Sequence, residues 1–172
     1  MIRIFGMILI IASTSLAGWK KAESFSETLK QMQYLYRIIN MIRSEIKYAR
    51  SYLGETFLTI GQQLRNPYNN WLIEIGKHLE DREGKHLEEM WDLSIKKHLK
   101  KTELPIEELH RLAELGNQLG LADMEMQMKN LDIYLKQLEE SIKEHKIELQ
   151  SKIKICQSIG IMSGIFISIL LL

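Results

Sequence analysis

The chain has 172 residues, of which 26% are charged and 45% apolar, a composition expected of one ordinary folded domain. Its 23 basic and 22 acidic residues give a formal net charge of +1, so charge gives no indication of a nucleic-acid-binding surface. The single cysteine, Cys156, excludes an intrachain disulfide.

The chain begins with an uncharged run from Ile4 to Trp19, between Arg3 and Lys20. As a helix this run is about 24 Å long, close to the roughly 30 Å of a bilayer core. We therefore expect an N-terminal transmembrane segment over residues 1–21. A cleaved signal peptide is the alternative, with Ser15 and Ala17 before the cut, and it would leave a secreted helical domain.

The segment that follows, residues 22–154, is predicted to be helical nearly throughout. A capping box of Ser24 and Glu27 starts a long helix that Gly54 is expected to break. Its apolar side chains recur every three or four residues, as on one helix face. They are Phe25, Leu29, Met32, Tyr36, Ile39, Ile42, Ile46, Ala49 and Leu53.

Shorter helices are expected next. One is predicted over residues 56–64, and Pro67 restarts the chain for another. A third carries the apolar row of residues 87–99 and ends in a basic cluster, where cations favour the helix dipole. The cluster consists of Lys96, Lys97, Lys100 and Lys101. Pro105 restarts the chain again, and Leu109 is expected to begin the apolar row of that helix.

Two glycines mark the end of this helix. Gly120 is placed to end it, and Asp123 to cap the next one. Gly116 falls inside the helix, where glycine costs about 1 kcal/mol relative to alanine, so a close backbone approach is the expected compensation.

A second long helix runs from Asp123 without proline or glycine until Gly160. Its apolar row contains the polar residues His145 and Lys152, which predicts a partner helix rather than full burial. After Lys154 the chain is uncharged to its end, and we expect residues 155–172 to form a C-terminal transmembrane segment about 27 Å long. The predicted fold is therefore all-α, a bundle on two long antiparallel helices with a transmembrane helix at each end.

Lysines flank both apolar runs on the side of the middle segment: Lys20, Lys21, Lys152 and Lys154. The positive-inside rule then predicts a cytoplasmic helical bundle with both termini outside. In the C-terminal run, Gly160, Gly164 and Ser168 are spaced for close packing of transmembrane helices, against the N-terminal span or a second copy. Small residues tolerated without a partner are the alternative interpretation.

No pattern of catalytic chemistry stands out. Glu107 and His110 have the spacing of half a di-metal site, but the second half is missing, so the five histidines are interpreted as solvated helix-face residues. Phosphate-binding and nucleophile-elbow motifs are absent too. We expect no catalytic, metal or cofactor residues, and no enzyme.

Four stretches in their order resemble the stage III sporulation protein AB family of endospore-forming bacteria. They are SEIKYA at 44–49, MWDLSIKK at 90–97, LGNQLGLADMEMQ at 115–127 and KICQSIGIMSGIFISILLL at 154–172. The family pattern has Glu and Tyr at Glu45 and Tyr48, two Leu-Gly pairs at Gly116 and Gly120, and an Asp and a Gln at Asp123 and Gln127.

The resemblance implies a role that periodicity does not show. The family is similar to the cytoplasmic domains of the inner-membrane platform protein of type II secretion and type IV pilus machines. It implies a scaffold of the channel complex between mother cell and forespore, in the outer forespore membrane, with a secretion-type ATPase as partner. Self-association is a further expectation.

Two partner surfaces follow: the small-residue row of the C-terminal span, and a polar surface on the bundle. The second comprises Glu45, Tyr48, Asp123, Gln127 and the basic cluster, for whose lysines a solvated face is the alternative. A membrane-anchored coiled-coil protein of cell division or signalling is the alternative function, and it predicts parallel self-association through the long helices.

Overall fold

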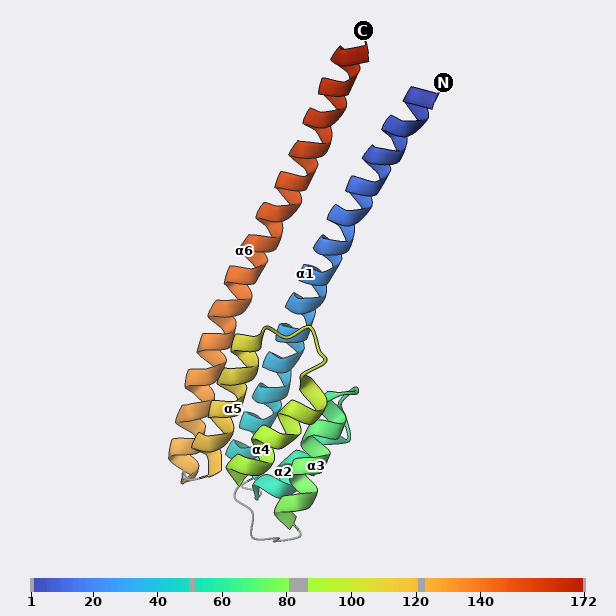
Figure 1. The fold of residues 1–172 in the computed structure, drawn as a ribbon. Coiled ribbons are helices and arrows are strands. Elements are labelled where there is room, and N and C mark those ends of the chain that lie inside the picture. Colours follow the sequence, from blue (N-terminus) through green and yellow to red (C-terminus); the bar gives the residue numbers. More distant parts are fainter. Residues whose placement is uncertain (1, 50–51, 81–86, 121–122, 172) are drawn as a thin grey trace. The chain divides into compact units, whose positions relative to one another are not determined.

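The structure is a computed structural model that describes residues 2–49, 52–80, 87–120 and 123–171; within them, the side chains of residues 2–24, 49, 153, 154 and 156–171 are not described. All regular structure in these ranges is helical, which confirms the all-α prediction (Figure 1). The elements are α1 (Ile2–Ala49), α2 (Leu53–Gly61), α3 (Tyr68–Glu80), α4 (Leu87–Ser94), a π-helical turn η1 (Ile95–Leu99), α5 (Ile106–Gly120) and α6 (Met124–Leu171).

The chain forms two compact units. Unit 1 contains residues 1–29 and 142–172, and unit 2 contains residues 30–141. Within unit 2, α1 and α6 run in opposite directions (Figure 1), and an ion pair of 2.5 Å between Arg43 Nε and Asp132 Oδ1 joins them. Residues far apart in sequence therefore meet in this bundle.

The core of unit 2 is built on one broad face of α1. Met32, Ile39, Ile42 and Ile46 of the predicted apolar row are all buried. Leu35 and Ile38 are fully buried as well, although they lie beside that row. A stripe of this width is typical of a helix that packs against several neighbours.

Three aromatic rings fill the centre of this core. Trp71 and Trp91 are fully buried and meet edge to face, with ring centroids 5.1 Å apart. Phe57 packs on Trp91 at 5.5 Å. Aromatic pairs of this geometry add about 0.5–1.5 kcal/mol each to the effect of burial. They tie together α2, α3 and α4.

The predicted helix start at Ser24 was wrong, because α1 already begins at Ile2, and the predicted break at Gly54 was wrong as well. The long helix ends earlier, at Ala49, and Gly54 is the second residue of α2, which runs over Leu53–Gly61 rather than residues 56–64. The physical reason is contact between helices: a Cβ on Gly76 of α3 would lie 2.9 Å from the backbone oxygen of Gly54. These glycines let α2 and α3 approach closely, so here glycine packs helices instead of ending one.

The π-helical turn explains how the row of residues 87–99 stays buried. Trp91, Ile95 and Leu99 are spaced by four residues, and in an α-helix of 3.6 residues per turn such a row drifts around the axis. A wider π turn corrects this drift. Ile95 and Leu99 are accordingly 3% and 0% exposed.

Unit 1 contains the chain's terminal stretches, where α1 begins and α6 ends at the same end of the pair (Figure 1). Lys152 Nζ lies 3.5 Å from the centroid of the Phe25 ring and 2.6 Å from Glu148 Oε1. This accounts for Lys152 within an apolar row, since its cation binds an aromatic face.

Among the residues whose side chains are described, no helix meets the length and hydropathy required of a membrane span. Apart from Ile155, the side chains of the two predicted spans lie outside the described residues, and so do Gly160, Gly164 and Ser168.

Candidate functional site

A surface cavity of about 290 Å³ opens between α1 and α2 in unit 2. Of the described residues that line it, Glu45 is the one with a charge; it lies beside Ser44 and Met41 of α1, with Thr59 and Ile60 on the α2 side. The Glu45 side chain is half-buried, and no hydrogen bond or ion pair joins it to any described residue. A carboxylate is thus held in a recess without an intramolecular cation.

The polar wall of this cavity is rich in hydrogen-bond acceptors. Asn40 Nδ2 donates to the Tyr36 carbonyl oxygen at 3.1 Å, and Gln63 Nε2 donates to the Thr59 carbonyl oxygen at 3.4 Å. Each amide donates to the carbonyl four residues before it, and no described residue donates to its side-chain oxygen, which is left to accept. With the Glu45 carboxylate, the lining favours a ligand with several N–H groups.

Two exposed tyrosines extend the helix rows that line this cavity. Tyr48 is three residues after Glu45 on α1 and is 78% exposed. Tyr52 directly precedes α2 and is 88% exposed. Lys47 Nζ lies 5.4 Å from the Tyr48 ring centroid, so one cation already approaches this ring. Exposed tyrosines are among the side chains that anchor protein partners.

The basic cluster is divided between paired and unpaired lysines. Lys97 Nζ lies 2.9 Å from both carboxylate oxygens of Glu74, and Lys96 Nζ lies 2.5 Å from Asp92 Oδ2. Lys100 and Lys101 are exposed and have no ion pair with the described residues. The cluster is therefore a solvated surface in which half of the charge is balanced locally.

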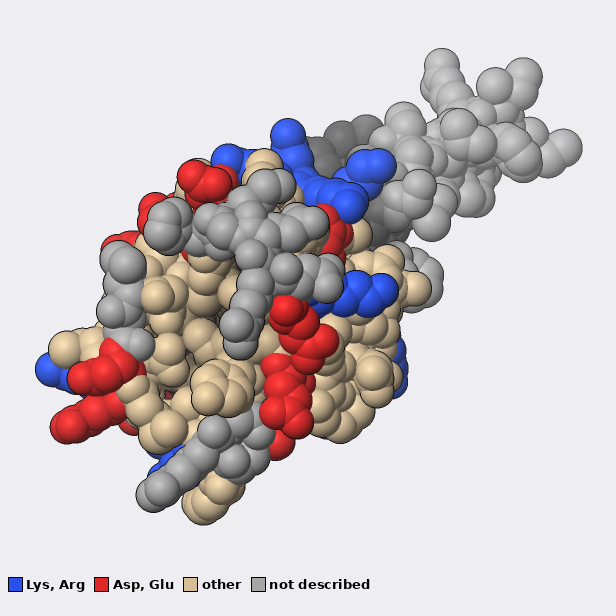
Figure 2. All heavy atoms as spheres, turned by 90° about the horizontal axis from the view of Figure 1, so that it is seen from below, with Lys and Arg blue, Asp and Glu red and all other residues tan. Residues whose placement is uncertain are grey.

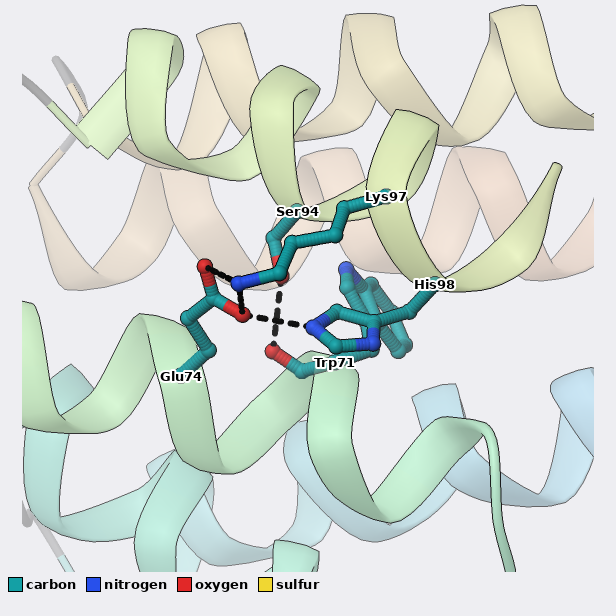
Figure 3. A network of polar contacts seen from close by, with 5 residues as sticks. All are labelled: Trp71, Glu74, Ser94, Lys97 and His98. Carbon is teal, nitrogen blue, oxygen red and sulfur yellow. Dashed lines mark hydrogen bonds and ion pairs between the residues drawn. The ribbon is translucent and has the colours of Figure 1, made fainter.

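Glu74 also receives a histidine, which contradicts the interpretation of all five histidines as solvated. His98 Nε2 lies 2.5 Å from Glu74 Oε2, and its side chain is only 16% exposed (Figure 3). Burial disfavours the charged Glu74 carboxylate, but the hydrogen bonds from His98 and Lys97 outweigh it and hold the Glu74 pKa below its ordinary value. In the same view Ser94 donates to the Trp71 carbonyl oxygen at 3.1 Å. The cluster fastens η1 to α3.

Asp123 and Gln127 have contacts within the chain. Asp123 Oδ1 accepts from the Met126 N–H at 2.9 Å, which confirms the predicted N-cap of α6. Gln127 Nε2 donates to the Leu119 carbonyl oxygen at 3.0 Å and so joins α6 to the end of α5. The predicted polar surface is consequently dispersed: no hydrogen bond or ion pair among described residues joins Glu45, the basic cluster and this corner.

Gly116 lies against an aromatic ring, in keeping with the close approach expected there. A Cβ at this position would lie 2.7 Å from Trp91 Nε1 and closer still to Cγ and Cδ1. The same Nε1 donates to the Leu112 carbonyl oxygen at 2.7 Å. At Gly120, the last residue of α5, a Cβ would lie 3.2 Å from Leu87 Cβ. Both glycines bring α5 close to α4.

Sequence reasoning missed a buried polar group in α5. Glu108 is 2% exposed, and Arg111 Nη1 lies 2.6 Å from its Oε1 and 2.7 Å from the Ser141 hydroxyl of α6. The phenol of Tyr134 is buried nearby; burial first, and the Glu108 charge second, raise its pKa well above the ordinary value. The spacing could have indicated this burial, because Glu108 lies four residues before Leu112 and so on the same helix face. Leu109 had instead been expected at the start of that buried row.

No group of three His, Cys, Asp or Glu side chains suited to a metal ion occurs among the described residues. Figure 2 shows the end of the bundle from which α2, α4 and α6 start; acidic side chains form several separate groups there, with fewer basic ones around them. This face is mixed in charge rather than uniformly basic.

Comparison with known proteins gave concordant results. The model of the family described as stage III sporulation protein AB matches residues 3–172. The stage III sporulation protein AB of Bacillus subtilis (strain 168) is 24% identical over 172 residues, with both chains covered completely. A solved structure of a stage III sporulation protein AB (SpoIIIAB) superposes with a TM-score of 0.64 at 23% identity, over 72% of this chain and 97% of the other. The structural likeness supports the fold.

Proposed function

Since this chain belongs to the stage III sporulation protein AB family, we propose that it is a non-enzymatic membrane scaffold of the channel complex between mother cell and forespore. Its helical bundle docks the secretion-type ATPase of that complex. The observation that carries the proposal is the match of the family model to residues 3–172, which spans the bundle and both apolar runs.

Both apolar runs insert in the outer forespore membrane, and the bundle faces the mother-cell cytoplasm. Support comes from Lys20, Lys21, Lys152 and Lys154, which flank the runs on the side of the middle segment. The two runs also belong to the same unit, as expected of a hairpin of two spans. This topology places the bundle where a cytoplasmic ATPase can reach it.

A scaffold role suits the described polar clusters. The Glu74 carboxylate is bound by Lys97 and His98, and the Glu108 carboxylate by Arg111. Each of these clusters joins two helices or two turns, and such ion pairs stabilise positions rather than activate a nucleophile. Protein and lipid contacts, without a cofactor, are the interactions we assign to the chain.

Parallel self-association through the long helices, as in a coiled-coil protein of division or signalling, is the weaker alternative. In unit 2 the buried face of α1 is already covered within one chain, and α6 pairs with α1 in the opposite direction. The long helices therefore meet their partner in the same molecule.

Co-purification from sporulating cells tests the proposal. The full-length chain, tagged at a terminus and extracted in mild detergent, is expected to bring the ATPase and other channel proteins with it. A variant with Lys101→Cys and Cys156→Ser carries a single cysteine on the bundle. Labelling it with a cysteine-reactive reagent shows on which side of the membrane the bundle lies. Protection of position 101 in intact cells and labelling after permeabilisation are expected. Labelling in intact cells would place the bundle outside the cytoplasm and exclude ATPase docking.

Two sets of variants separate the contribution of the C-terminal span to assembly from that of the basic cluster to ATPase binding. Gly160→Leu combined with Gly164→Leu is expected to weaken assembly while membrane insertion persists, because bulky residues block close helix packing in lipid. Charge reversal of Lys100 and Lys101 is expected to weaken ATPase binding. Unchanged recovery of partners with the glycine pair replaced would remove the packing role of the C-terminal span.

A further inference from the structure

We infer that the cavity between α1 and α2 is the docking site for an arginine side chain that a partner protein presents to Glu45. The inference deepens the proposed function, on which it rests, by giving the scaffold a receiving site and the partner a chemical identity. It follows from two independent features of the cavity: its charge and the polarity of its wall.

The charge of the cavity comes first. Among the described residues Glu45 is the only charged one in the lining, and none of them neutralises it. Other half-buried or buried carboxylates in unit 2 behave differently: Glu74 and Glu108 each have a cation within 3 Å. A charged carboxylate that lines a recess without a cation of its own is complemented by a cation from outside.

The wall of the cavity selects guanidinium over ammonium. Beside the carboxylate, the side-chain oxygens of Asn40 and Gln63 are left to accept, because each amide donates to its own helix. The hydroxyls of Ser44 and Thr59 complete the polar lining. Arginine offers five N–H donors in a fixed plane and can address several acceptors at once, whereas lysine offers three from a single atom. The volume of about 290 Å³ is far above the roughly 10–15 Å³ that one water molecule needs.

The apolar part of the lining supplies contact area for the rest of the partner. Met41 and Ile60 give apolar contact inside the cavity, and Tyr48, three residues after Glu45 on α1, is 78% exposed. Tyrosine and arginine are the residues most enriched in the energetic centres of protein interfaces.

Photo-crosslinking in sporulating cells tests this inference with the full-length chain. A benzophenone amino acid at position 59, in place of Thr59, samples the cavity, and the same probe at Lys136, an exposed residue of α6, is the matched control. We expect the probe at position 59 alone to capture a partner segment that contains an arginine, identified by mass spectrometry. Glu45→Gln is expected to reduce this crosslink about tenfold, as for loss of a charge-assisted hydrogen bond.

Exchanging the charges of Glu45 and the captured arginine is the decisive experiment. Glu45→Arg should abolish the crosslink, and replacing the captured arginine with glutamate should restore it. Gln63→Lys, which leaves Glu45 in place but brings a competing cation to it, should also lower the crosslink. Glu107→Gln, which neutralises an exposed carboxylate of α5, should leave it unchanged. Circular dichroism and melting of each purified variant show that the fold is retained.

The remaining outcomes count against the inference. Capture of a second copy of this chain, of lipid, or of a segment without arginine would overturn it, as would failure of the swap. If partners co-purify with the full-length chain but the probe at position 59 captures none of them, the docking site is wrong and the scaffold function stands. If no partner co-purifies at all, both fail.

Discussion

Replacement of Gly116 by alanine tests how α5 packs on α4. The added methyl group would lie 2.7 Å from Trp91 Nε1 and closer to Cγ and Cδ1 of the same ring. Trp91 is fully buried, and its Nε1 donates to the Leu112 carbonyl oxygen at 2.7 Å. The indole therefore has no room to yield unless it gives up this hydrogen bond or α5 moves away.

The magnitude follows from three contributions to the free energy of unfolding. Alanine favours the helix over glycine by about 1 kcal/mol. Against this, overpacking of a filled core costs about 1–3 kcal/mol, and a buried N–H left without its acceptor costs about another 1–3 kcal/mol. The net loss is about 3 kcal/mol, and for a chain of 172 residues this lowers Tm by about 6–12 °C.

The assay is thermal and denaturant unfolding of the full-length chain in detergent, followed by far- and near-ultraviolet circular dichroism. Gln118→Ala, an exposed change on the same helix, should stay within about 0.5 kcal/mol of the unchanged chain. Trp91→Phe is the second substitution of a double-mutant cycle with Gly116→Ala. Because the smaller ring leaves space for the added methyl group, Gly116→Ala should cost little stability in the Trp91→Phe background. A Gly116→Ala chain as stable as the original would refute the packing argument.

Three further predictions concern polar contacts. Asp123→Ala should cost about 1 kcal/mol, since it removes the acceptor of the Met126 N–H at the start of α6, and Asp123→Asn should restore most of this in urea unfolding. Glu74→Gln should lower the free energy of unfolding near neutral pH, because the lowered native pKa of Glu74 means that its ionised form stabilises the fold. The difference in free energy between variant and original should shrink as pH falls from 4.5 through the lowered native pKa, where Glu74 becomes protonated. A difference that stays constant down to about pH 3 would contradict this. Arg111→Met should cost about 3 kcal/mol by leaving the Glu108 carboxylate buried without its cation, and adding Glu108→Met should recover most of the loss. A double variant no more stable than Arg111→Met alone would contradict this explanation.

Much of the fold could be read from spacing alone. The apolar row of α1 predicted Met32, Ile39, Ile42 and Ile46 as core residues, and all four are buried. The N-cap at Asp123 was also predictable, because an acidic residue after a glycine-rich stretch has a specific local hydrogen bond to make. These features depend on residues near one another in sequence.

Features that depend on a neighbouring helix were not predictable in the same way. Gly54 was expected to end a helix, but its role is set by Gly76, whose position next to it arises only when α2 and α3 pack. The π turn is likewise a response to burial of Ile95 and Leu99 on one face. His98 was interpreted as solvated because Glu74 comes from another helix.

The polar residues that the family pattern singles out can now be separated by what they contact. Asp123 and Gln127 have intramolecular roles, in a helix cap and in a bond to Leu119, so their chemistry is accounted for within one chain. Glu45 has no such partner among the described residues, although it is half-buried. A carboxylate without a cation among the described residues is the stronger evidence for an external one, because its charge is still available to a partner.

The basic cluster is a weaker candidate than Glu45 for a specific contact with a partner. The pairs of Lys96 and Lys97 with acidic residues join side chains that are 67% and 63% exposed on the lysine side, and surface pairs of this kind contribute about 0–1 kcal/mol. Either lysine can therefore exchange its intramolecular acid for one on a partner at little cost, and Lys100 and Lys101 have no pair among the described residues to give up. The cluster can strengthen an encounter through long-range attraction, but its flexible, solvated ammonium groups specify no geometry.

We accordingly expect lysine replacements to slow association and make it less sensitive to salt, and Glu45 replacements to speed dissociation. Stopped-flow binding at two ionic strengths separates these effects, and a Glu45 variant altered only in its association rate would show that the cavity steers the partner without holding it.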